Sequence, residues 1–109
     1  MRALVLQAHD GAGALAVQAM RGLGMKVTAQ VPVGVHPEGV VGEDMEVVVG
    51  DDPIEVIGRL EEGVFDAVVD TVGGRSVWDA CRRVMCSDAH VSSDRRTPLW
   101  LSYERAGRG

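Results

Sequence analysis

The chain begins, between Ala3 and Lys26, with the sequence ALVLQAHDGAGALAVQAMRGLGMK, in which an apolar run leads into a glycine turn and then into apolar residues at helical spacing. The letters from Gly11 to Ala16 fit the pattern G-x-G-x-x-G/A. In that pattern the first glycine permits a tight turn, the second lets the backbone approach a pyrophosphate, and the third small residue lets helix and strand pack closely. Backbone N–H groups from about Gly13 onward are expected to point at the anion. The pattern predicts a phosphate site lined by Gly11, Ala12 and Gly13, although a plain strand–turn–helix connection would use the same glycines.

Length and composition place the chain in one class of protein. Its 109 residues suffice for one hydrophobic core, and 46% hydrophobic and 25% charged residues are typical of a soluble α/β domain. We expect a cytoplasmic protein with no membrane contact, because no signal peptide follows Met1 and no apolar run approaches the roughly 18 residues of a membrane helix. Two cysteines are too few for a disulfide framework, and the net charge of −5 argues against a nucleic-acid partner.

Strand and helix patterns alternate along the chain, which predicts a parallel sheet with right-handed crossovers. The first helix is expected to end at Gly24, and the second to begin at Asp52, an N-cap residue followed by Pro53. The expected strands are Ala3–Ala8, Val27–Val31, Glu46–Val49 and Phe65–Asp70. The expected buried helix faces are Ala16, Met20 and Leu23, then Ile54, Ile57 and Leu60, then Val77, Cys81 and Val84.

The C-terminal segment has a different character. A further strand could begin at Ala89-His90-Val91, but the polar run from Ser92 to Arg96 cannot continue a buried strand. Beyond it neither a period of 2 nor a period of 3.6 is sustained. We therefore expect residues 1–91 to form the domain and residues 92–109 to form an irregular or disordered tail.

Two separated motifs resemble one family. The sequence VLQAHDGAGALAVQAMRGLGMKVTA, from Val5 to Ala29, is followed later by FDAVVDTVGG, from Phe65 to Gly74. This combination resembles the nucleotide-binding domain of the medium-chain dehydrogenase/reductase superfamily, and within it the zinc-free quinone oxidoreductases and enoyl reductases. The resemblance covers roughly residues 3–91. It implies a partial Rossmann-type doubly wound parallel sheet with four to five strands and about three helices.

The resemblance also implies a nicotinamide dinucleotide as ligand. Besides the glycine turn, the expected cofactor-binding residues are Gln30, Asp70, Thr71, Val72 and Gly73. For Asp70 the preferred role is to shape the loop beside the cofactor. The residues after the second strand include neither an acid for an NAD ribose nor an Arg or Lys for an NADP 2′-phosphate. The resemblance alone favours NADP, with NAD possible.

One departure from the family bears on affinity. When the chain is aligned on Ala16-Val17-Gln18, the usual Gly-Gly-Val-Gly of the family falls on Asp10 to Gly13, so an aspartate replaces the first glycine. A carboxylate at a pyrophosphate site repels the ligand by about 1–2 kcal/mol unless the side chain turns away. We therefore expect weak nucleotide binding.

Two functions are compatible with these motifs. The first is that of an NAD(P)H-binding part of an oxidoreductase; the substrate domain that family members carry is absent from this sequence, so the isolated chain is predicted to be inactive. The alternative is a non-catalytic module that binds a nucleotide weakly, or that binds a protein partner or a second copy through an open sheet edge. No catalytic residue is assigned. No metal site is expected, because Cys81, Cys86 and His90 match no common zinc spacing.

Overall fold

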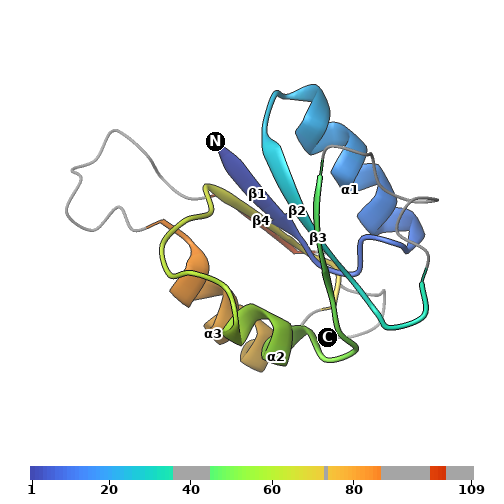
Figure 1. The fold of residues 1–109 in the computed structure, drawn as a ribbon. Coiled ribbons are helices and arrows are strands. Elements are labelled where there is room, and N and C mark those ends of the chain that lie inside the picture. Colours follow the sequence, from blue (N-terminus) through green and yellow to red (C-terminus); the bar gives the residue numbers. More distant parts are fainter. Residues whose placement is uncertain (36–44, 73, 87–98, 103–109) are drawn as a thin grey trace.

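The structure is a computed structural model, and it describes residues 1–35, 45–72, 74–86 and, for the backbone, 99–102. Strands and helices alternate along most of the chain (Figure 1). In chain order they are β1 (Arg2–Val5), α1 (Gly11–Gly22), β2 (Lys26–Val31), β3 (Glu46–Val49), α2 (Pro53–Gly58), β4 (Ala67–Asp70), α3 (Arg75–Val84) and β5 (Leu99–Ser102).

The strands form one sheet in the order β3-β2-β1-β4-β5, and every neighbouring pair is parallel. This is the strand order of the Rossmann fold over its first five strands. Helix α1 covers one face of the sheet, and α2 and α3 cover the other (Figure 1). The predicted fold class, a partial doubly wound parallel sheet with three helices, is therefore confirmed.

Alternation along the central strands produces two cores, one on each face of the sheet. In β1, Ala3 and Val5 pack with Val17 and Met20 of α1. Leu4 lies on the opposite face, in the cluster that contains Ile57 of α2 together with Val77, Cys81 and Val84 of α3. Because β1 is covered on both faces, its apolar run is continuous and does not alternate with polar residues.

The helix boundaries agree with the predicted signals, but two residues that were predicted to be buried are exposed. Asp52 caps α2, with its Oδ1 accepting a hydrogen bond from Ile54 N at 3.0 Å, and Gly24 follows α1 with a φ of 84°. Leu23 is 72% exposed, because it is the C-cap residue where the chain leaves the helix. Ile54 is 40% exposed in the first turn of α2, and Val56 is buried.

The expectation of an irregular tail is wrong for four residues. The backbone of Leu99–Ser102 forms β5, which pairs with β4 in the register Ala67↔Leu99 to Asp70↔Ser102. A parallel partner on β4 thus overrides the weak local pattern, and the sheet extends beyond the predicted boundary at residue 91. The possible strand start at Ala89-His90-Val91 lies outside the described residues.

Candidate functional site

The carboxyl ends of β1 and β4 are adjacent, and the chain leaves them toward opposite faces of the sheet. Leu6 N donates to Val69 O at 3.0 Å, which extends the pairing of the two strands beyond Val5. Thr71 Oγ1 in turn donates to Leu6 O at 3.0 Å and ties the two strand ends together. Since β2 and β3 lie on one side of β1 and β4 lies on the other, this is the switch point of the sheet, where ligands of such folds bind.

The start of α1 lies directly after this strand end. A turn over residues 7–10 follows β1, and its positive φ belongs to Gln7, at 53°, rather than to a glycine. Asp10 is the N-cap residue, and Ala14 N donates to Asp10 O at 2.7 Å. The N–H groups of Gly11, Ala12 and Gly13 precede this first helical bond and have no acceptor within the helix. Together with the helix dipole, they favour an anion at this end.

The two fingerprint glycines exchange the roles predicted for them. A Cβ on Gly13 would overlap the carbonyl oxygen of Gln7 and would lie 2.9 Å from Ala8 Cα, so Gly13 allows the helix to approach the chain's own turn. A Cβ on Gly11 would have no atom within 4 Å, and Gly11 and Ala12 are exposed. The position open to a ligand is therefore Gly11, whereas Gly13 is buried against protein backbone.

Two polar side chains flank the start of α1. Asp10 is exposed and makes no side-chain capping hydrogen bond. The Nδ1 atom of His9 is buried and has no hydrogen-bond partner within the described residues. A buried ring nitrogen in this state is a polar group that a ligand could satisfy.

Gln30, predicted as a cofactor contact, supports the turn from beneath. Its side chain is fully buried, its Oε1 accepts from Gln7 N at 2.8 Å, and its Nε2 donates to Gly50 O at 2.8 Å. Both ends of the amide are thus used inside the protein, so the prediction of a direct contact is replaced by a positioning role. Gln30 joins the carboxyl ends of three strands, since Gln7 follows β1 and Gly50 follows β3.

The loop after β4 combines a structural aspartate with residues that face outward. Asp70 is buried, and its Oδ1 accepts from Val72 N at 2.8 Å, which is the loop-shaping role preferred for it. Thr71 is partly exposed and Val72 is exposed at the switch point, whereas Gly73 lies outside the described residues. Gly74, the N-cap residue before α3, has a φ of 100°, a conformation that favours glycine.

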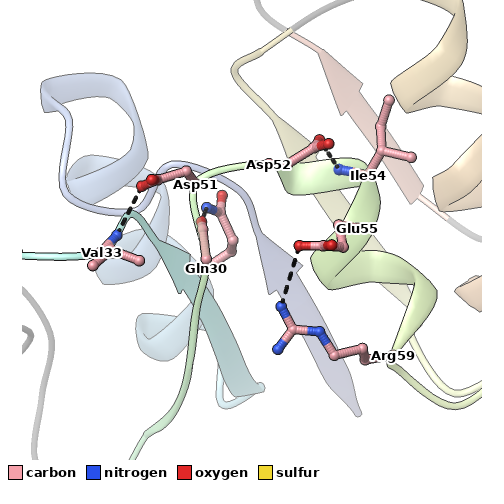
Figure 2. A network of polar contacts seen from close by, with 8 residues as sticks. Gln30, Val33, Asp51, Asp52, Ile54, Glu55 and Arg59 are labelled. Atoms are coloured by element: carbon pink, nitrogen blue, oxygen red, sulfur yellow. Dashed lines mark hydrogen bonds and ion pairs between the residues drawn. The ribbon is translucent and has the colours of Figure 1, made fainter.

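The end of β3 contributes acidic residues that the sequence reading did not assign to the site. Asp51 Oδ1 accepts a hydrogen bond from Val33 N at 3.0 Å, which brings this exposed carboxylate to the carboxyl end of β2 (Figure 2). Asp52 follows as the cap of α2. The signal was present in the sequence, because parallel strands end at the same edge and Asp51 comes directly after the third predicted strand.

Three further features bear on function: the Cys81 thiol, the capacity to hold a metal ion and the length of the helices. Burial, together with the charge of Asp70, raises the pKa of the Cys81 thiol to about 12, so this thiol stays protonated at neutral pH. The described residues contain no cluster of three or more His, Cys, Asp or Glu that could hold a metal ion. Within the same residues, no helix has the length and apolar character needed to cross a membrane.

Comparison with solved structures finds similar folds. A probable oxidoreductase from Mycobacterium abscessus superposes with a TM-score of 0.61 and 29% identity, over 93% of this chain and 34% of that chain. A SAM-dependent methyltransferase from Archaeoglobus fulgidus superposes with a TM-score of 0.58 and 15% identity, over 78% of this chain and 40% of that chain. The chain thus spans about a third to two fifths of the length of these proteins. No protein-family model and no curated protein sequence matches it.

Proposed function

We propose that this chain is the nucleotide-binding part of an oxidoreductase and that it binds a nicotinamide dinucleotide at the carboxyl ends of β1 and β4. The observation that carries the proposal is the start of α1 at the switch point, where Gly11 leaves open space and three backbone N–H groups lack helical acceptors. The 29% identity with a probable oxidoreductase over 93% of this chain supports the same class. The motifs around Gly11–Gly13 and Asp70–Gly74 support a relative of quinone oxidoreductases and enoyl reductases.

The residues present fit such a ligand. A pyrophosphate would be held by the N–H groups of Gly11, Ala12 and Gly13, with the unpartnered His9 Nδ1 close by in the sequence. Thr71 and Val72 would border the nicotinamide half, because they follow β4. A bound nicotinamide dinucleotide would supply hydride-transfer chemistry. The residues described here orient and position it, and the substrate would be held by another domain or chain.

A cytoplasmic location and an association surface complete the proposal. Cys81 and Cys86 form no disulfide bond among the described residues, which suits a reducing compartment. The alternative function, binding of a protein or a second copy along the sheet edge that missing strands would leave open, would use β5, which is the edge of the described sheet on the side of β4. Nucleotide binding is the better-supported function, because the features around Gly11 have no role in edge pairing.

Direct titration tests the nucleotide site. We expect NADPH or NADH to bind the purified chain with a dissociation constant no tighter than tens of micromolar, because the chain contains only part of a dinucleotide site and each 1.4 kcal/mol lost weakens binding tenfold. Gly11→Val should weaken binding by at least about tenfold, since its side chain would fill the open space at the helix start. Isothermal titration calorimetry measures both constants.

Gly22→Val is the matched control for this experiment. Gly22 lies at the other end of α1, and a Cβ there also has no atom within 4 Å. The two variants therefore make the same substitution in the same helix but differ in distance from the proposed site. Submicromolar binding, equal weakening by both variants, or the absence of any dinucleotide binding by the folded wild type would contradict the proposal.

Asp10→Gly should tighten dinucleotide binding by about three- to tenfold at low salt, because it removes a negative charge beside the proposed phosphate site. The same change should slightly lower the free energy of unfolding, since an acidic residue at the N-cap interacts favourably with the helix dipole. Calorimetry at low and high salt, together with urea denaturation, checks both effects. If affinity does not change at low salt, the Asp10 carboxylate does not face the ligand.

A further inference from the structure

We infer that the site selects a dinucleotide whose adenosine ribose carries no 2′-phosphate, so that NAD binds in preference to NADP; this inference rests on the proposed function. It runs against the cofactor that the family resemblance favours. Two features favour NAD: the lack of Lys and Arg between Val27 and Gly58, and a carboxylate held at the end of β2.

Around the carboxyl ends of β2 and β3, which would border the adenosine half of the site, the described residues between Val27 and Gly58 include no Lys or Arg. In a Rossmann fold the adenosine ribose lies beyond the carboxyl end of β2, and an Arg near that position accommodates a 2′-phosphate. Here the sequence from Val27 to Gly58, which includes β3, α2 and all of β2 except Lys26 at its amino end, contains no Lys or Arg. Its described residues include four acidic ones: Glu46, Asp51, Asp52 and Glu55.

Asp51 brings one of these charges to the position of the ribose. No acidic residue follows β2 directly, but the hydrogen bond from Val33 N holds the Asp51 carboxylate beside the end of that strand. Its second oxygen remains available to accept a bond from a ribose hydroxyl. The same carboxylate would repel a phosphate on the 2′-oxygen. An acid supplied by β3 thus takes the part that an acid after β2 plays in NAD-binding folds.

Arg59 is the first cation that follows this segment. It lies at the C-terminal end of α2, where its Nη2 is 3.9 Å from Glu55 Oε1 (Figure 2). Both side chains are more than half exposed, so the pair is weak and a 2′-phosphate could recruit Arg59. The test therefore includes a variant of Arg59.

The experiment compares NAD+ and NADP+ on the same protein by isothermal titration calorimetry. We expect NAD+ to bind the wild type at least about tenfold more tightly than NADP+, with a smaller ratio at high salt, where the repulsion is screened. Asp51→Asn should reduce the ratio by tightening NADP+ binding, because asparagine keeps an acceptor for Val33 N but carries no charge. Glu61→Gln removes an equal charge from an exposed residue in the connection between α2 and β4, and it should leave the ratio unchanged, as should Arg59→Gln.

Each other outcome has a definite meaning. If NADP+ binds the wild type as tightly as NAD+, the inference is wrong while the proposed function stands. The inference is also wrong if Glu61→Gln changes the ratio as much as Asp51→Asn, or if Arg59→Gln selectively weakens NADP+ binding. If the folded wild type binds neither dinucleotide, both proposals fail. If Asp51→Asn does not fold, the ratio of the wild-type dissociation constants for NADP+ and NAD+ still tests the inference.

Discussion

Replacement of Gly13 by alanine is expected to lower the free energy of unfolding by about 2–4 kcal/mol. The added Cβ would overlap the carbonyl oxygen of Gln7 and would lie 2.8 Å from its carbonyl carbon. These neighbours are backbone atoms in a turn fastened to β2 by Gln30, so they cannot move aside as a flexible side chain can. Urea denaturation followed by circular dichroism measures the loss.

Gly11→Ala provides the matched comparison for Gly13→Ala. The substitution is the same, it lies two residues earlier in the same helix, and a Cβ there has no atom within 4 Å. Alanine is favoured over glycine in a helix, so Gly11→Ala should leave the free energy of unfolding unchanged or raise it by up to about 1 kcal/mol. Equal destabilisation by both variants would show that Gly13 has no special contact with the turn.

The fold could be predicted because its signals are local. The apolar residues of β1 are buried on both faces of the sheet, as a continuous apolar run predicts. The start of α2 is marked by two adjacent residues, the N-cap Asp52 and Pro53. The errors arise where tertiary contacts decide. Leu23 continues the helical spacing but falls where the chain leaves α1, and Leu99–Ser102 forms a strand only because β4 offers a parallel partner. The local sequence pattern encodes neither the exposure of Leu23 nor the pairing of β5 with β4.

In the candidate site too, some features follow from the local sequence and others depend on tertiary contacts. The glycine spacing predicts a turn at the correct place, but which glycine faces outward depends on how closely Gln7 approaches Gly13. The sequence indicates that Asp51 lies at the carboxyl edge of the sheet, but its hydrogen bond beside the end of β2 follows from the pairing of β2 with β3. The family resemblance implies a cofactor contact for Gln30, but its side chain is buried and its amide bonds to the protein's own backbone at Gln7 and Gly50.

Gln30→Leu is expected to lower the free energy of unfolding by about 2–4 kcal/mol and to weaken dinucleotide binding. Leucine matches the size of glutamine but leaves Gln7 N and the buried Gly50 O without their partners, and each unsatisfied buried group costs about 1–3 kcal/mol. Loss of the bond to Gln7 also releases the turn that positions the start of α1. Urea denaturation and calorimetry measure the two effects separately.

Gln30→Glu separates hydrogen bonding from packing at the same position. A protonated glutamic acid can accept from Gln7 N and donate to Gly50 O, as Gln30 does. A carboxylate at this buried position could not donate, so its charge would face the Gly50 carbonyl oxygen. Burial raises the pKa of such a carboxyl in the folded protein, so the contribution of this group is fully present below its unfolded pKa and is lost as the pH rises through the folded value. The deficit in unfolding free energy relative to wild type should therefore be smaller at pH of about 4 than at pH of about 8, while that of Gln30→Leu should not depend on pH. If Gln30→Glu shows the same deficit at both values, the amide acts only by filling space, and the link from Gln30 to the candidate site is lost.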